Sequence, residues 1–227
     1  MADPPPPDDT AGHRARLRGR LLDGGGLLDH ELIEYLLALA IPRRDTKPLA
    51  KALLREFGGI GGVLTADAQA LRRVDGMGDT SIAALKIAHA SALRLLQADV
   101  AARPVLANWQ ALLDYLRADM AHHVIERFRV LHLNTKNVLI RDEVMSEGTI
   151  DQTAVHVREV IGRALDLGSA AIVLVHNHPS GDPSPSRADI EVTRAIAEVA
   201  KRMGISLHDH LIIGAKGHVS LRSQGLI

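Results

Sequence analysis

The fold is decided by a short stretch late in the chain, AAIVLVHNHPS, residues 170–180. Its first six residues form a continuous apolar run of strand length, which is typical of a strand buried on both faces of a sheet. Side chains alternate along a strand, so histidines two positions apart project on the same side. His176 and His178 fall where the run ends, and we expect both imidazoles to point into the crevice beyond the C-terminal end of the strand, a frequent place for ligands.

A loop and then a helix follow this strand. The helix is predicted over Pro185–Met203, with Ser184 as its N-cap. Asp189 lies one turn into this helix, and Ser186 shares its face. Two imidazoles and one carboxylate form a suitable ligand set for a catalytic zinc ion, with the fourth position left to water. The alternative is coincidence, because the helix dipole alone favours an aspartate near a helix N-terminus.

The second half of the chain alternates between strand and helix patterns. The predicted helices are Trp109–Met120 and Val155–Leu167, and the predicted strands are Phe128–Leu133, Val138–Val144, Ile205–Ile213 and His218–Leu221. This order predicts a mixed sheet with helices packed against it, an α+β or mixed α/β domain over residues 105–227.

The first half of the chain reads differently. Residues 27–98 have helical periodicity and predict an all-α domain of short helices. One of these is expected over Ala66–Arg73 with Thr65 as its N-cap. Residues 1–26 contain a proline run and four alternating arginines, so we expect a flexible leader, disordered or forming a single short helix. Residues 97–104 are the predicted junction between the two domains.

Composition limits the classes of function. Basic and acidic residues are equal in number, 27 of each, so no net field draws the chain toward nucleic acid or an anionic membrane. There is no cysteine, which excludes disulfides, thiol nucleophiles and thiolate metal sites, so any metal must be held by histidines and carboxylates. No stretch resembles a signal peptide or a membrane span, and we expect a cytoplasmic protein with no membrane partner.

The full pattern H-x-H-P-x6-S-x2-D, at a strand–loop–helix junction, resembles the JAMM motif of the JAB/MPN metalloproteins. The surrounding residues are more similar still to the bacterial RadC family, over three segments: 133–137, 170–186 and 209–214. The resemblance covers residues 30–227 approximately. It implies a JAB/MPN (cytidine-deaminase-like) fold and a protein or peptide substrate. It also implies site roles: His176, His178 and Asp189 as Zn2+ ligands, and Ser186 as a donor to the oxyanion of the tetrahedral intermediate.

Two residues depart from the related patterns. Asn177 replaces the Ser or Thr that is usual between the histidines of deubiquitinases, which argues against ubiquitin-like substrate recognition but suits the RadC pattern. Val157 stands where the RadC family more often has proline, a change that concerns only a helix start.

The family also requires an upstream glutamate as general base. Zinc lowers the pKa of its bound water from about 15.7 to roughly 7, and a nearby carboxylate can take the proton and pass it to the leaving amine. The candidates are Glu126, Glu143, Glu147 and Glu159. We favour Glu126, because it comes just before the first predicted strand and close to the family's position for this residue. A surface glutamate at a strand start is the alternative.

A second pair, His208 and His210, also alternates on a predicted strand. We expect this pair to have a structural role or to supply hydrogen bonds that orient the zinc ligands, rather than to form a rival metal site, because it has no third ligand at a suitable spacing. The remaining histidines considered, His122, His123 and His218, are predicted to lie at the surface.

Residues 74–78, Val-Asp-Gly-Met-Gly, precede a predicted helix and resemble a helix-hairpin-helix element. Gly76 and Gly78 allow a tight turn, and backbone N–H groups at the next helix could hold a DNA phosphate without reading sequence. Two features argue against DNA binding. Asp79 lies in the first turn of the next helix, where a cation or a neutral residue would suit a phosphate better. Residues 41–98 also have only a mild basic excess, nine basic against five acidic residues. A glycine turn used for packing is an equal alternative.

Three functions follow from these patterns. The first is a zinc-dependent metallohydrolase of the RadC/JAMM type that cleaves a peptide or isopeptide bond. The second is a DNA-associated repair accessory or metal-dependent nuclease, in which the Gly76–Gly78 hairpin gives weak, non-specific DNA binding. The third is an interaction scaffold with a structural zinc, against which the complete set of ligands, serine and glutamate argues.

Overall fold

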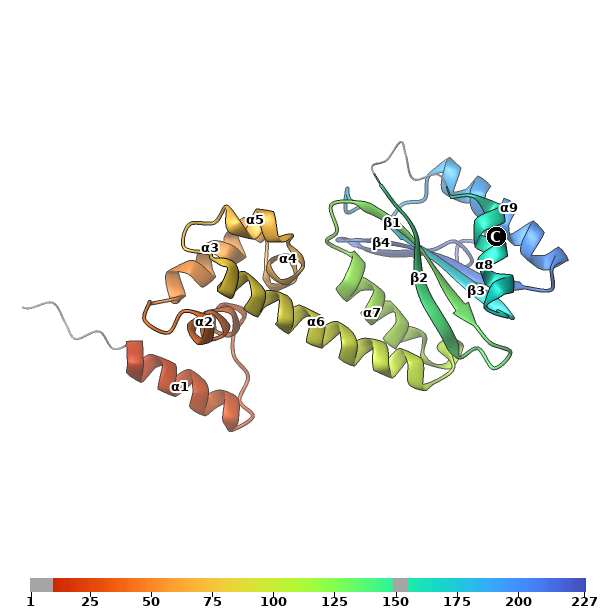
Figure 1. Ribbon diagram of the computed structural model, residues 1–227. Coiled ribbons are helices and arrows are strands. Elements are labelled where there is room, and N and C mark those ends of the chain that lie inside the picture. Colours follow the sequence, from red (N-terminus) through yellow and green to blue (C-terminus); the bar gives the residue numbers. More distant parts are fainter. Residues whose placement is uncertain (1–9, 149–154) are drawn as a thin grey trace, which may run out of the picture. The chain divides into compact units, whose positions relative to one another are not determined.

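The structure, a computed structural model, describes residues 10–148 and 155–227 (Figure 1). The chain divides into two compact units at Ser91 and Ala92. This boundary falls inside helix α6 (Asp79–Ala102), which continues into the predicted junction over residues 97–104. Helix α6 continues through residues 92–102 because this segment has alanines and leucines but neither glycine nor proline.

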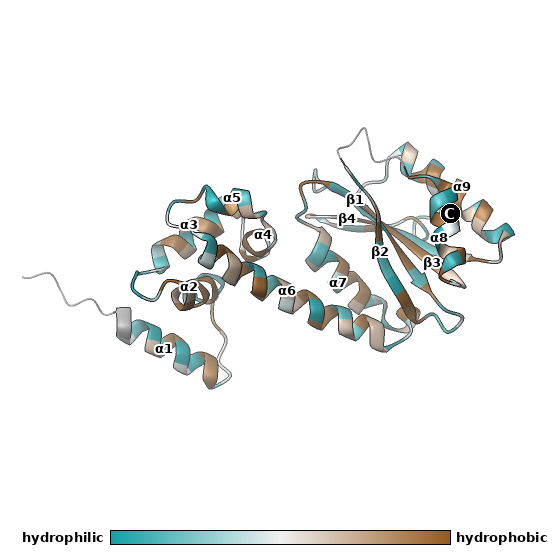
Figure 2. Cartoon of the chain, in the orientation of Figure 1, coloured by the Kyte–Doolittle hydropathy of each residue, from teal (hydrophilic) through white to brown (hydrophobic). Residues whose placement is uncertain are grey.

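The first unit is helical. Its elements are α1 (Thr10–Leu22), α2 (Asp29–Ala40), α3 (Lys47–Phe57), α4 (Ile60–Thr65), α5 (Ala68–Arg72) and the first part of α6. The helices enclose an aliphatic cluster that includes Ile33, Leu37, Leu53, Leu71 and Leu85. Helix α2 contributes Ile33 and Leu37 to it and is mostly hydrophobic, as its colouring in Figure 2 shows.

The sequence predicts a flexible leader or a short helix at the start of the chain. Residues 1–9 of that leader lie outside the described residues. The rest contains α1, in which Leu17 is buried with 1% of its surface exposed. Arg20, at the end of α1, lies 2.8 Å from the carboxylate of Glu31 in α2. This part of the leader is therefore a packed helix.

The cap predicted for the helix over Ala66–Arg73 of the first unit is wrong. Asp67 caps α5 by accepting the N–H of Ala70 at 2.8 Å, whereas Thr65, the predicted cap, ends the separate helix α4. The hydroxyl of Thr65 donates to Gly61 O at 2.7 Å within that helix. Two polar residues close together can each start a helix, and an aspartate is the stronger cap of the two.

The second unit is built on one mixed sheet. Its helical elements are a 3₁₀ turn (Val105–Asn108), α7 (Trp109–Met120), α8 (Val157–Asp166) and α9 (Arg187–Arg202). Its strands are β1 (Glu126–Leu133), β2 (Leu139–Gly148), β3 (Ala171–Asn177), β4 (Ser206–Gly214) and β5 (Gly217–Ser220). The strand order is β2-β1-β3-β4-β5. Only β3 and β4 run parallel among the described strands. The predicted mixed sheet with flanking helices is confirmed.

Helices cover both faces of this sheet (Figure 1). Side chains on one face, such as Leu131 and Val173, pack with α7 and the end of α6. Side chains on the other face, such as Val130 and Ile172, pack with α8 and α9. All seven residues of β3 are buried, as the continuous apolar run predicts.

The sheet also brings distant segments together. Strands β1 and β3 are antiparallel neighbours, with Phe128 opposite His176. The start of β1 therefore meets the end of β3, although about fifty residues separate them in sequence. Among the described residues, no helix has the length and apolarity needed to cross a membrane.

Candidate metal centre

The two histidines of the opening stretch lie at the C-terminal end of β3. His176 is inside the strand with 1% of its surface exposed, and His178 follows its last residue. The backbone N–H of His178 still donates to Ile213 O of β4 at 2.9 Å. The chain therefore leaves the sheet only after His178, and both rings stay on the same side of it.

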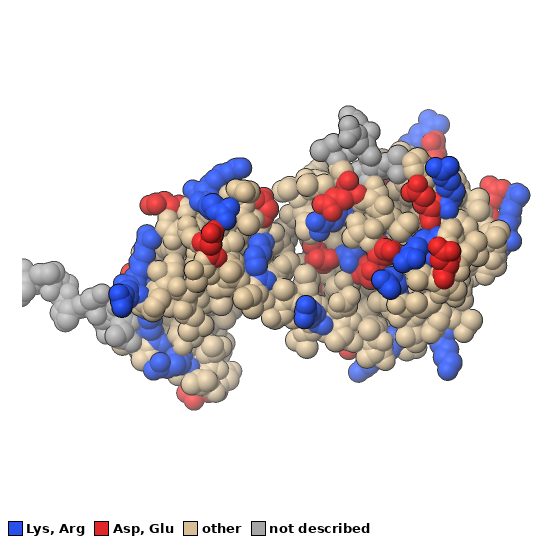
Figure 3. Space-filling view, viewed as in Figure 1, with Lys and Arg blue, Asp and Glu red and all other residues tan. Residues whose placement is uncertain are grey.

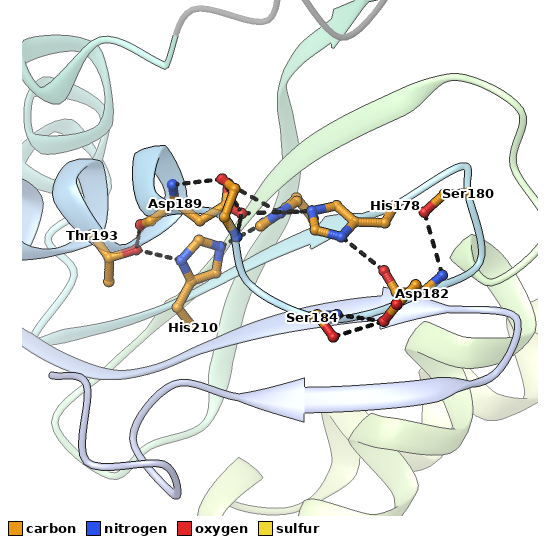
Figure 4. A network of polar contacts seen from close by, with 9 residues as sticks. His178, Ser180, Asp182, Ser184, Asp189, Thr193 and His210 are labelled. Atoms are coloured by element: carbon orange, nitrogen blue, oxygen red, sulfur yellow. Dashed lines mark hydrogen bonds and ion pairs between the residues drawn. The ribbon is translucent and has the colours of Figure 1, made fainter.

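Asp189, in the first turn of α9, completes a group of three side chains (Figure 4). Nε2 of His176 lies 3.0 Å from Nε2 of His178 and 3.4 Å from Oδ1 of Asp189. Nε2 of His178 lies 3.6 Å from Oδ2 of Asp189. Donor atoms about 2.0–2.1 Å from one ion at tetrahedral angles lie roughly 3.3 Å apart. Among the described residues, this is the one such group close enough to share an ion.

The ring of His178 is oriented by the loop that follows it. Its Nδ1 lies 2.9 Å from the backbone oxygen of Asp182. A carbonyl oxygen can only accept, so Nδ1 carries the proton and Nε2 carries the lone pair. The loop is held in turn by Asp182, whose carboxylate accepts the N–H of Ser184 at 3.0 Å and its hydroxyl at 2.8 Å (Figure 4).

The ring of His176 is oriented by two buried side chains behind it. The hydroxyl of Thr193 donates to the backbone oxygen of Asp189 and lies 2.5 Å from Nδ1 of His210. Because the hydroxyl proton is used on the carbonyl, Nδ1 of His210 donates and its Nε2 accepts. That Nε2 lies 2.8 Å from Nδ1 of His176, which must therefore donate. Nε2 of His176 is left with its lone pair.

The two lone pairs meet at the same place as the aspartate. Two lone pairs 3.0 Å apart beside a carboxylate repel one another unless a proton or a metal ion lies among them. Burial would raise the pKa of Asp189, but His176 and His178, when protonated at Nε2, hold it well below its usual range. Asp189 in turn favours the protonated form of His178 and so raises the pKa of His178. The three side chains thus form a corner that attracts positive charge.

Ser186 fixes the carboxylate of Asp189. Its hydroxyl and its backbone N–H both donate to Oδ2 of Asp189 at 2.7 Å, and its hydroxyl oxygen accepts the N–H of Asp189 at 3.1 Å. This reciprocal pair is a capping box. Ser186 is therefore the N-cap of α9, and the prediction of Ser184 is wrong, because Asp182 holds Ser184 in the loop.

A cavity of about 490 Å³ opens in front of these three side chains. Glu126, the first residue of β1, lies at its wall together with Ser180 and Ser186. Phe128, Val155 and Val192 supply an apolar side. The cavity thus combines a candidate cation corner, a carboxylate and an apolar surface.

The other three candidate glutamates lie elsewhere. Glu143 is 2.7 Å from Arg163, and Glu147 is 3.1 Å from Arg127. Glu159 is exposed in the first turn of α8. Of these four glutamates, all among the described residues, Glu126 is the one that lines the cavity.

Comparison with known proteins agrees with this geometry. Residues 106–226 match the family model described as a RadC-like JAB domain. The chain belongs to the RadC family. It is 49% identical to a UPF0758 protein of Ruegeria pomeroyi over 217 residues, 95% of this chain and 97% of the relative. It is 50% identical to a UPF0758 protein of Rhodobacter capsulatus over 213 residues, 93% of this chain and 100% of the relative.

The second histidine pair of this RadC-family chain is split between two tasks. His210 contacts His176, which is the orienting contact considered for the pair. His208 instead lies 2.6 Å from the side-chain oxygen of Asn137 in the β1–β2 turn. His123, predicted at the surface, is half-buried, with its Nε2 2.9 Å from Nη1 of Arg127. His122 and His218 are exposed.

Sequence reasoning missed two parts of the site. Thr193 lies one helical turn after Asp189 on the same face of α9, and this spacing of four is a signal that could have identified it. The backbone oxygen of Asp182, which orients His178, carries no sequence signal, since every residue has one.

The glycine hairpin of the first unit has a different character. Gly76 has φ 91°, a conformation that favours glycine. The N–H of Gly78 is already bonded to the hydroxyl of Ser81 at 2.9 Å, and Asp79 pairs with Arg72 at 2.6 Å. Figure 3 shows that basic and acidic side chains are mixed on the visible surface of the first unit. DNA binding by the hairpin stays a prediction.

Proposed function

We propose that this RadC-family protein is a zinc-dependent hydrolase that cleaves an amide, either a peptide or an isopeptide bond. The observation that carries the proposal is the meeting of two Nε2 lone pairs, the Asp189 carboxylate and Glu126 at one cavity. Two neutral imidazoles and one carboxylate are the ligands of catalytic zinc in hydrolases, and three protein ligands leave a position open.

The residues fit this ion without rearranging their protons. Nδ1 of His178 is committed to Asp182 O and Nδ1 of His176 to His210. Each ring therefore presents Nε2 in its ligand form. When bound, zinc would supply a polarised water of lowered pKa.

Each remaining residue then has a task in hydrolysis. Glu126 takes a proton from the attacking water and delivers it to the leaving amine. Ser186 can turn its hydroxyl toward the developing oxyanion, because its N–H still holds Oδ2 of Asp189. Phe128, Val155 and Val192 hold an apolar part of the substrate and keep bulk water away.

The test compares zinc-loaded wild-type protein with Glu126→Gln on mixtures of peptides and isopeptide-linked peptides, read by mass spectrometry. Wild type should release new amino and carboxyl ends, and Glu126→Gln should lose roughly 100-fold or more in rate while keeping its zinc. Glu143→Gln is the matched control, since Glu143 pairs with Arg163 away from the cavity. Equal rates for wild type and Glu126→Gln, or no amide cleaved by wild type, would contradict the proposal.

A second candidate, non-specific DNA binding by the first unit, is supported by one contact. The exposed guanidinium of Arg44 lies against Gly76, since a Cβ there would be 2.6 Å from its Nη1. A cation at the hairpin suits a phosphate. Binding of labelled duplex DNA at several salt concentrations should weaken for Arg44→Ala, with a salt slope smaller by about one. Arg202→Ala, an exposed change in α9, is the control, and equal slopes would reject this candidate.

A further inference from the structure

The residue between the two histidines does not face the metal corner. Asn177 is buried, with 1% of its surface exposed. Because side chains alternate along β3, its carboxamide projects to the face opposite His176. There it meets the segment between α7 and β1, which leads into Glu126.

The backbone ladder between β1 and β3 ends at Phe128 and His176. Beyond this point the side chain of Asn177 supplies the hydrogen bonds. Its Oδ1 accepts the backbone N–H of Arg127 at 2.9 Å. Its Nδ2 donates to the backbone oxygen of Ile125 at 3.1 Å and to that of His123 at 3.4 Å.

These bonds hold the backbone on both sides of Glu126. Residue 125 is bonded through its oxygen and residue 127 through its nitrogen, so the peptide groups flanking Glu126 are both tied to one side chain. A carboxamide is suited to this because it offers an acceptor and two donors, as a peptide group does. A serine or threonine has one short hydroxyl, and an aspartate has no donor and would bury a charge.

We propose that Asn177 is a positioning residue that fixes Glu126 at the wall of the metal cavity. The proposal rests on the proposed function of Glu126 as the base. Three consecutive residues would then have two tasks. His176 and His178 would bind the ion, and Asn177 would fix the position of the base. A shift of the base by about 1 Å is enough to reduce a rate by two orders of magnitude.

The first test needs neither metal nor substrate. Amide exchange at Arg127 is measured by NMR on the full, metal-free chain for wild type, Asn177→Ala and the milder Asn177→Ser. Both variants should speed exchange at Arg127 by roughly five- to tenfold, while amides of the remaining β1–β3 ladder keep their protection.

Asn134→Ala is the matched control for this measurement. Asn134 also bonds backbone amides through its side chain, to Lys136 at 2.9 Å and Val138 at 3.1 Å, but at the far end of β1. It should leave Arg127 unchanged. Unchanged exchange at Arg127 in Asn177→Ala and Asn177→Ser would overturn the proposal.

The second test reads the position of Glu126 with Co2+ in place of zinc. The pH midpoint of the visible spectrum is measured for wild type, Glu126→Gln, Asn177→Ser and the double variant. Each single change should shift the midpoint in the same direction, and the double variant should shift no further than Glu126→Gln alone.

The possible failures are distinguishable. If wild type binds no Co2+, the proposed function fails, and the exchange measurement alone decides whether Asn177 holds the backbone at Glu126. If Glu126→Gln shifts the midpoint and Asn177→Ser does not, the positioning role is wrong. If neither shifts it, Glu126 does not act at the metal corner and both proposals fall.

Discussion

Two His-x-His pairs lie on neighbouring parallel strands, and only one of them belongs to a group of side chains, among the described residues, that could hold a metal ion. His176 and His178 straddle the end of β3, whereas His208 and His210 lie inside β4. Their register differs as well, since His176 is beside Ile212 and His210 is beside Leu174. Both rings of the first pair therefore line the cavity, whereas the second pair contributes only the buried ring of His210 behind His176.

Helix α9 contacts both pairs through two residues that lie one helical turn apart. Asp189 gives its carboxylate to His176 and His178, and Thr193 gives its hydroxyl oxygen to His210. The middle residues differ too. Asn177 holds the start of β1, and Asp209 holds the C-terminal turn by accepting the N–H of Arg222 at 3.0 Å. Spacing alone thus does not make a ligand pair; the end of the strand and a third partner do.

The largest change in zinc affinity is expected when one of the proposed ligands is removed. His176→Ala or His178→Ala should weaken zinc binding by roughly 1,000-fold or more, since each takes away one of three protein ligands. Competition with a coloured chelator measures this. Wild-type affinity in either variant would show that the corner does not hold the ion.

The next effect is expected at the residue behind His176. His210→Ala removes the acceptor of Nδ1–H of His176 and should reduce zinc affinity roughly 10- to 100-fold. His210→Gln keeps an acceptor and should recover part of the loss. If the two variants bind zinc equally, the hydrogen bond between His210 and His176 does not orient the ring of His176.

A smaller loss is expected one step further away. Thr193→Val preserves the shape of the side chain but leaves Nδ1–H of His210 without its partner. Zinc affinity should fall several-fold, at the low end of what outer partners contribute, roughly tenfold at most. Thr193→Ser should bind as wild type does. A loss as large as that of His210→Ala would mean that Thr193 acts on the ligands in another way.

The smallest effect on zinc is expected for the remaining histidine. His208→Ala should leave zinc affinity unchanged and lower the free energy of unfolding by about 1 kcal/mol, because it removes one hydrogen bond to Asn137. Chelator competition and urea unfolding measure the two quantities. A change in zinc affinity would show that the two pairs are not separate.

Much of the second unit could be predicted from the sequence. Trp109–Met120 is the helix expected, and the apolar run before His176 is the buried strand expected. The structure brings together the predicted ligands, because strand alternation and helix spacing already place them. It also puts Glu126 at the cavity.

What could not be predicted depends on competition between similar residues. Ser184 and Ser186 are both good caps, and Asp182 decides between them by binding the first. The end of α6 is a second example. The residues before Pro104 suit a continuing helix as well as a junction between domains, and in the structure the helix continues to Ala102. The Asn177 contacts join residues about fifty positions apart, which local patterns do not contain.

Asp189 belongs to the capping box of α9 as well as to the proposed ligand set. In an unfolded chain that helix turn does not exist, so the three ligands would be scattered and the ion would have nothing to bind. Loading with the ion would therefore pull the equilibrium toward the folded state. The melting temperature of the second unit would then serve as a gauge of free zinc in the surrounding solution.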